Sequence, residues 1–218
     1  MAKKKWVRPS SDRILEAAEL VFARHGYADT SLRQLMTAAK ISTTAFYARF
    51  DSKEAVLQAL VTGLLSDVGE RARVELGKAE GLEEGFRGAV DVLFDVISSR
   101  RDLVCIALTE ACASPDITRT LGGLYAALAR LLSARIEKLA AHGDAAAVDS
   151  GAVAWGIVGA LNMQVLRWAV YEQIGTNALR EQLHAVADSF LPALRPAHGV
   201  RRGRARSVAG RMQRGSNP

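Results

Sequence analysis

The segment from Ser31 to Phe50, SLRQLMTAAKISTTAFYARF, constrains the fold more than any other part of the chain. In its first half, apolar residues recur at the spacing of one helix face: Leu32, Leu35, Met36 and Ala39. Ser42 then stands where an N-cap side chain accepts a backbone N–H bond. A second short helix, expected over about residues 43–50, places Phe46 and Phe50 on one side. The segment therefore predicts two helices joined by a tight turn.

The second of these helices has a small, polar leading end. Its outward-facing residues are Thr43, Thr44, Tyr47 and, nearby, Arg49. Such a helix suits insertion into the major groove of DNA, because only its N-terminal side chains need to reach the base edges. The pattern therefore indicates a helix-turn-helix that reads DNA.

The remainder of the chain indicates an all-α fold. Alternating strand patterns are absent, and long alanine- and leucine-rich stretches recur at helical spacing across the 218 residues. The longest apolar run, Gly151 to Val170, contains Asn162, Gln164 and Arg167. A membrane-spanning helix would have to hide that arginine, so we expect a buried helix and no membrane association.

Charge changes sign along the chain. Residues 1–50 carry nine Lys and Arg against four Asp and Glu, whereas residues 51–194 carry thirteen against nineteen. Residues 195–218 add seven Arg and no acidic residue. Basic ends on an acidic body favour a nucleic-acid-binding module joined to a module of another kind.

These patterns divide the chain into four parts. We expect a basic arm over residues 1–10, a helix-turn-helix DNA-binding domain over 11–70 and a helical domain over 71–195. The arginine-rich tail, residues 196–218, is expected to be disordered because it has little apolar content. Two interpretations of the tail remain open: nonspecific attraction to phosphates, or a solvated tail with no role.

Enzyme chemistry finds no support in the sequence. The four histidines are scattered, and neither HExxH nor CxxC spacing nor a glycine-rich phosphate loop occurs. We expect no catalytic residue, no metal site and no cofactor.

Cysteine usage predicts a cytoplasmic location. Cys105 and Cys112 share one apolar helical segment, where a rise of about 1.5 Å per residue places them too far apart for a disulfide. We expect small, buried, reduced residues, the alternative being a thiol sensor. The basic N-terminus leads into no apolar signal region, which also favours the cytoplasm.

Residues 11–65 resemble the N-terminal domain of TetR-family transcriptional regulators. The matching stretch is ILEAAELVFARHGYADTSLRQLMTAAKISTTAFYARFDSKEAVL. The family pattern has a first helix ending in Gly-Tyr, then Thr-Ser, a turn, an aromatic recognition helix and Ser-Lys-Glu. Here these elements are Gly26-Tyr27, Thr30-Ser31, Ala39-Lys40-Ile41-Ser42, Phe46-Tyr47, Phe50 and Ser52-Lys53-Glu54.

The resemblance implies a set of DNA contacts. Thr30, Ser31 and Lys53 would meet phosphates, and Thr43, Thr44 and Ala45 would face base edges. Tyr47 would touch the DNA backbone or a thymine methyl, the alternative being a half-buried packing tyrosine. Arg33 would be a further DNA contact or a solvated helix charge.

Four positions depart from the family pattern, Met36, Lys40, Thr44 and Arg49, and two of these bear on DNA binding. Lys40 occupies the usual turn glycine, so a positive φ there would carry strain while adding a cation near phosphates. Thr44 replaces another common glycine and offers a hydroxyl and a methyl group to the bases. Both are kept as candidate DNA-contacting residues.

The resemblance further implies an effector pocket and a homodimer in the helical domain. Candidate effector-binding residues are Glu110, Trp155, Asn162, Met163 and Arg167, each with core packing or a solvated charge as the alternative. The last two helices, about residues 149–172 and 176–194, are the expected dimer interface. Small residues every four positions, Ala152, Gly156 and Ala160, would let another helix come close, either from a second subunit or from the same chain.

The function implied by the resemblance is a homodimeric repressor that a small-molecule effector releases from a palindromic operator in double-stranded DNA. One alternative is a DNA binder without a small-molecule ligand, acting through a protein partner or as a nucleoid-type factor aided by its tail. An enzyme is the other alternative, with little support.

Overall fold

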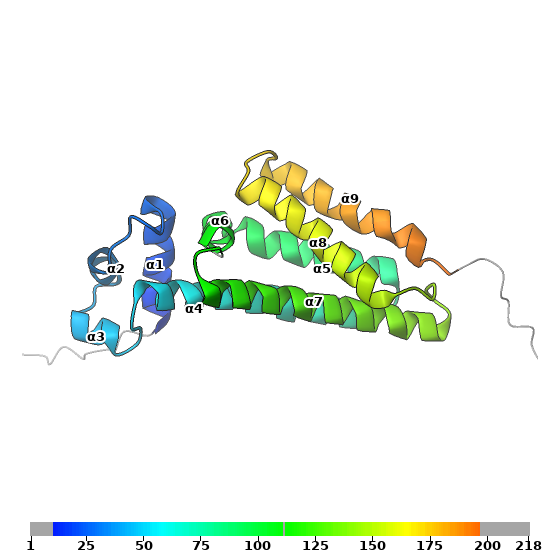
Figure 1. Cartoon of the computed structure of the whole chain (residues 1–218), viewed down its shortest axis with the longest axis horizontal. Helices are drawn as coiled ribbons and strands as arrows, with labels where there is room; N and C mark the ends of the chain where they lie inside the picture. Colours follow the sequence, from blue (N-terminus) through cyan, green and yellow to red (C-terminus); the bar gives the residue numbers. More distant parts are fainter. Residues whose placement is uncertain (1–10, 111, 197–218) are drawn as a thin grey trace, which may run out of the picture.

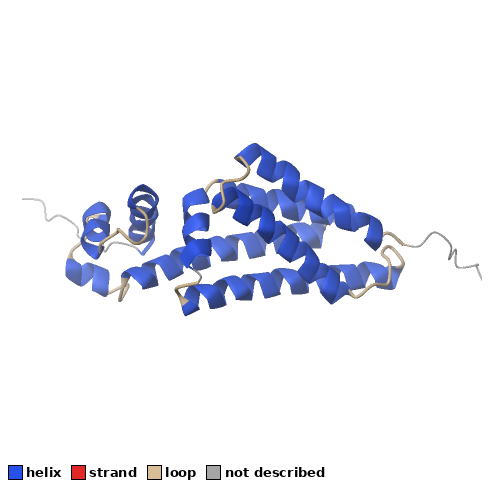
Figure 2. Cartoon of the chain, turned by 45° about the horizontal axis from the view of Figure 1, so that its top comes forward, coloured by secondary structure: helices blue, strands red, loops and turns tan. Residues whose placement is uncertain are grey.

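Helices make up the regular structure of the residues that the computed structural model describes, 11–110 and 112–196, and confirm the all-α expectation (Figures 1 and 2). In chain order they are α1 (Ser11–His25), α2 (Leu32–Ala39), α3 (Thr43–Tyr47), α4 (Lys53–Lys78), α5 (Leu82–Ser98), α6 (Arg101–Glu110), α7 (Pro115–His142), α8 (Ser150–Ala169) and α9 (Thr176–Leu194). The expected arm and, from residue 197, the expected tail lie outside the described residues.

The first three helices form a small unit at one end of the molecule (Figure 1). Gly26, with φ of 77°, ends α1 in the left-handed conformation that glycine adopts without strain. Ser31 caps α2 in a capping box with Gln34, and Ser42 caps α3 by accepting a bond from the Ala45 N–H. These local signals place the two helices of the predicted helix-turn-helix, although α3 ends three residues earlier than expected.

Helix α4 joins this unit to the rest of the protein. It packs against α1 near its start and against α5 and α7 farther along (Figure 1). The expected domain boundary at residue 70 falls inside α4, which continues to Lys78. Ser52 caps it by accepting a bond from the Ala55 N–H at 3.1 Å, although Asp51 and Glu54 have the spacing of a capping box.

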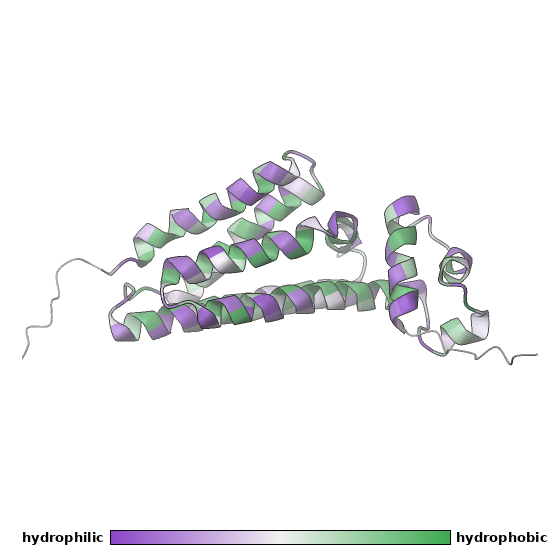
Figure 3. Ribbon diagram, turned by 180° about the vertical axis from the view of Figure 1, so that it is seen from behind, coloured by the Kyte–Doolittle hydropathy of each residue, from purple (hydrophilic) through white to green (hydrophobic). Residues whose placement is uncertain are grey.

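The helical body is built on the parallel pair α4 and α7. Ser114 caps α7, Pro115 is its first residue and Gly143 ends it with φ of 83°, and these residue types favour those positions. Helices α5, α8 and α9 complete the body, with α8 packed on α7 and α9 packed on α5 and α8. Figure 3 shows hydrophobic and hydrophilic residues alternating along these helices, as expected for elements that each bury one face.

Two arginines lie at the corner between α5 and α6. Neither of them ends α5, because that helix ends at Ser98 and Arg101 begins α6. Arg100 instead forms a two-pronged ion pair with Glu19 of α1, at 2.6 and 2.7 Å. Arg101 donates to the Trp168 carbonyl at 3.2 Å and pairs with Glu172 at 3.0 Å. The corner is thereby fastened to α1 on one side and to the end of α8 on the other.

The structure also bears on the two cysteines and on membrane association. Both cysteines are free, but Cys112 follows the end of α6 and is exposed, so its expected burial is wrong. Among the described helices, none is long and apolar enough to cross a membrane.

Candidate nucleic-acid interface

The side chain of Phe46 holds α3 in place. It is fully buried, and its ring packs edge-on against Tyr47 and at a tilt against Phe50, with centroid separations of 5.5 and 6.2 Å. Because α3 has only five residues, its own backbone hydrogen bonds cannot hold it helical, and this packing must do so. The inward face of α3 therefore fixes the direction of its outward face.

That outward face carries the predicted base-reading residues. Thr43 and Thr44 are exposed at the N-terminal end of α3, and Ala45 is partly buried behind them. Tyr47 has 51% of its surface exposed, so it is not the half-buried packing residue of the alternative interpretation. Arg49 lies exposed just past the helix.

The residues expected at phosphates lie in different environments. Ser31, Arg33 and Lys40 are exposed on or beside α2. Thr30 is only 3% exposed, and its hydroxyl donates to the Gly26 carbonyl at 2.6 Å. The Thr30 hydroxyl is therefore occupied by a hydrogen bond at the end of α1. The side chains exposed for phosphate contacts on the α2 side are those of Ser31, Arg33 and Lys40.

Lys53 fastens the start of α4 to the loop after α1. Its Nζ donates to the carbonyls of Tyr27 at 2.8 Å and Ala28 at 3.1 Å, and lies 4.4 Å from the centre of the Tyr27 ring. Burial, and then the neighbouring carboxylate of Glu54, raise the pKa of the Tyr27 phenol, so this residue stays neutral. One of the three ammonium donors of Lys53 remains for a phosphate.

Lys40 adopts the strained conformation that its glycine-like position implies. Its φ of 53° and ψ of 49° lie in the left-handed region, where a lysine costs about 1–2 kcal/mol more than glycine before chain entropy is counted.

We expect Lys40→Gly to raise the free energy of unfolding by about 1 kcal/mol, measured by urea denaturation. If Lys40 meets a phosphate, the same variant lowers the slope of log K against log salt for DNA by about one. An unchanged slope in Lys40→Gly would remove Lys40 from the interface.

A cavity of about 120 Å³ lies in the body, between α4, α5, α7 and α8. Its wall includes Leu64, Val68 and Ala72 of α4 and Leu121 to Leu132 of α7. The polar residues on the wall are Tyr125 and Asn162, whose side chains are hydrogen-bonded at 2.7 Å. Tyr125 was not predicted from the sequence, although a tyrosine buried in an apolar helix requires a hydrogen-bond partner.

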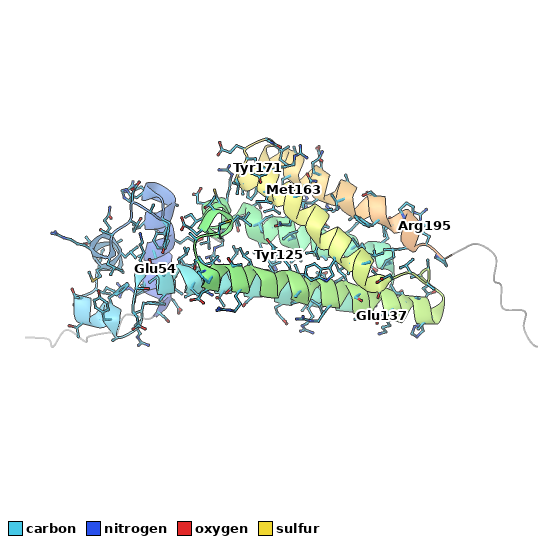
Figure 4. All side chains as sticks on the ribbon, in the orientation of Figure 1. Glu54, Tyr125, Glu137, Met163, Tyr171 and Arg195 are labelled. Carbon is cyan, nitrogen blue, oxygen red and sulfur yellow. The ribbon has the colours of Figure 1, made fainter. Side chains whose placement is uncertain are left out.

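Of the five predicted effector residues, only Asn162 lines this cavity. Trp155 and Met163 lie on the outside of α8, with 52% and 48% of their surfaces exposed. Figure 4 shows the position of Met163. Arg167 donates to Gln164 and Gln173 at the end of that helix. Glu110 is the last residue of α6 and is not part of the cavity wall.

Comparisons with known proteins agree with this arrangement. Residues 14–60 match the sequence model of "Bacterial regulatory proteins, tetR family". The chain is 33% identical to the transcriptional regulator EthR of Mycolicibacterium smegmatis over 153 residues, which cover 65% of this chain and 70% of EthR. It is 31% identical to the uncharacterized regulator YuxN of Bacillus subtilis over 97 residues, but this match spans 44% of the chain and only 33% of YuxN. The fold is similar to that of FadR from Bacillus subtilis, solved in complex with stearoyl-CoA, with a TM-score of 0.70, 16% identity and coverage of 84% of this chain and 98% of FadR.

Proposed function

The chain belongs to the TetR family of transcriptional regulators, and from that premise we propose that it is a homodimeric repressor released from its operator by a small effector. Membership of the family makes it a helix-turn-helix DNA-binding regulator and not an enzyme. Repression, dimerisation and effector release are the parts proposed here.

The observation that carries the proposal is the continuity of α4. The N-terminal part of this helix packs with the DNA-reading unit, and Leu64, Leu65 and Val68 farther along form part of the cavity wall. A ligand that changes the position of α4 at the cavity therefore also moves the reading unit. Release requires that the effector bind the DNA-incompetent conformation more tightly. A ligand with equal affinity for both conformations does not shift the equilibrium between them.

The proposed DNA contacts follow the geometry of the interface. Thr43, Thr44 and Ala45 face the base edges, and Tyr47 touches the DNA backbone or a thymine methyl. The phosphate contacts are Ser31, Arg33, Lys40 and the remaining donor of Lys53, with the Thr30 backbone beside them. Base contacts give specificity, and phosphate contacts set the register on the duplex.

The proposed dimer uses the outer side of α8 together with α9. Trp155, Gly159 and Met163 follow one another at four-residue spacing, so they share one exposed helix face. A Cβ added at Gly159 would meet no atom of the same chain within 4 Å, whereas one at Gly156 would meet the Phe190 ring of α9 at 3.4 Å. Gly156 thus lets α9 approach within the chain, and Gly159 leaves room for a second subunit.

The cavity is smaller than most ligand pockets. Ligand pockets usually measure about 300–1,000 Å³, and the cavity here is about 120 Å³. An effector of ordinary size must therefore widen the space between its helices. FadR, a protein of similar fold, was solved with stearoyl-CoA, which favours an effector with an apolar chain for this protein too.

The proposal is tested first by titrating the protein into the DNA immediately upstream of its own gene across a salt series. We expect binding at least about 10³-fold tighter than to scrambled DNA of the same length. Tyr47→Ala is expected to weaken the specific complex by about tenfold to 100-fold, because this exposed side chain is a proposed DNA contact.

The control for that variant is Tyr171→Ala, which removes another exposed tyrosine, far from α3 (Figure 4). It should leave the affinity for the upstream DNA unchanged. Equal, steeply salt-dependent binding to both DNAs, unaffected by Tyr47→Ala, would reject autoregulation and indicate phosphate attraction alone.

A further inference from the structure

The wall of the cavity excludes charged ligands. Apart from Tyr125 and Asn162, the residues that line it are aliphatic or phenylalanine, and no charged side chain is among the described residues on the wall. A carboxylate or ammonium group moved into such a wall loses its hydration and meets no opposite charge. An ionised ligand would therefore bind far more weakly than a neutral ligand of the same shape.

The cavity wall follows two parallel helices. On α4 its wall extends from Leu64 to Leu76, and on the parallel helix α7 from Leu121 to Leu132. At about 1.5 Å per residue these stretches are each roughly 17–18 Å long. An extended aliphatic chain can therefore stay in contact with apolar side chains of both helices.

The two polar residues occupy one part of this space. Tyr125 lies on the half of α7 nearer the DNA-reading unit, and its hydroxyl donates to the Asn162 amide oxygen across the α7–α8 contact (Figure 4). That bond leaves the amide nitrogen of Asn162 as a donor. Burial raises the pKa of the Tyr125 phenol, so the pair presents neutral groups.

We propose that the effector is an uncharged, linear aliphatic compound with a single hydrogen-bonding head group, an alcohol or ester, which Tyr125 and Asn162 recognise. The head group accepts a hydrogen bond from one of these residues, and the chain extends along α4 and α7 toward Leu76 and Leu132. The chain separates the two helices, which places the ligand against the helix that continues into the reading unit. This inference rests on the proposed function and names the ligand class of its effector site.

The test uses the full-length protein and three probes with the same chain: 1-octanol, octanoate and octylamine, at pH 7.5. Ligands that bind only the folded state raise the melting temperature in proportion to their affinity. We expect 1-octanol to raise it in a concentration-dependent way, and the two ionised probes to leave it unchanged at the same free concentration. Stabilisation by octanoate or octylamine equal to that by 1-octanol would overturn the proposal, as would no stabilisation by any probe.

Two variants test the hydrogen-bonding pair. Tyr125→Phe and Asn162→Leu should each lower the affinity for 1-octanol by about tenfold, the usual worth of one hydrogen bond. Octane, which lacks the head group, serves as the internal reference, so that the ratio of 1-octanol to octane affinity falls even if a variant is less stable. Tyr171→Phe, at an exposed position just after α8, is the matched control and should leave this ratio unchanged. An unchanged ratio in both cavity variants would overturn the assignment of the pair.

DNA release is measured separately with the same probes. If 1-octanol binds as expected and operator DNA stays bound, the ligand class stands and release by an effector is rejected. If octanoate releases the DNA and 1-octanol does not bind, release stands and the ligand class is rejected.

Discussion

Replacing Phe46 by alanine is expected to lower the free energy of unfolding by about 3–5 kcal/mol and to abolish specific DNA binding. The side chain is fully buried and is the only buried one on α3, so the variant leaves a cavity beneath the whole helix. A five-residue helix without this anchor has too few hydrogen bonds of its own to persist. Urea denaturation at fixed protein concentration measures the first effect, and titration with upstream DNA the second.

The neighbouring residue supplies the control for this prediction. Tyr47→Ala removes an aromatic ring of similar size from the exposed side of α3, so it should cost less than about 1 kcal/mol of stability while still weakening DNA binding. The pair thus separates folding from recognition on one short helix. A stability loss below about 1 kcal/mol for Phe46→Ala would show that other contacts hold α3 in place.

The elements predicted most accurately are those with local signals. The predicted Ser42 cap depends on residues within one helical turn, as do the Ser114-Pro115 start of α7 and its Gly143 end. The same signals are ambiguous at the start of α4, because Asp51 and Ser52 are both capping residues and only the backbone conformation decides between them. Local chemistry therefore determines these helix ends.

The contacts between distant helices could not be predicted in this way. Arg100 and Glu19 are 81 residues apart in the chain, and Arg101 and Glu172 are 71 apart. No pattern within either segment indicates these partners. For Lys53, the family resemblance implied a phosphate contact, but its two bonds to carbonyls after α1 depend on how α4 packs.

The effector residues were hard to predict because α8 is apolar on most of its surface. Helical spacing identifies an inward face only where a polar face contrasts with it. In α8, Trp168 is buried whereas Trp155 and Met163 are exposed, and all three are large and hydrophobic. Only Asn162, a polar residue on the inner side, distinguished the cavity wall, and its partner Tyr125 lies 37 residues earlier.

The exposed side of α8 is the proposed dimer interface, and charged residues placed there should separate the subunits. We expect the double variant Trp155→Glu, Met163→Glu to convert the dimer into a monomer, because it would place four charges, two from each subunit, in an apolar interface. Loss of the second reading unit should lower the affinity for a palindromic operator by about 10²–10⁴-fold, since the second half-site is no longer bound within the same complex. Sedimentation velocity measures the oligomeric state, and titration with full and half operators measures the loss.

Leu20 provides the matched control for the dimer, because it is the most exposed large hydrophobic residue described, at 73%, and lies on α1 away from α8. Leu20→Glu should leave the sedimentation coefficient unchanged. The affinity of the double variant for a half operator should equal that of the unmodified protein, since its α3 is intact. A double variant that stays dimeric would exclude this face of α8 from the interface. A monomer that still binds the full operator as tightly as the unmodified protein would show that recognition does not depend on two linked reading units.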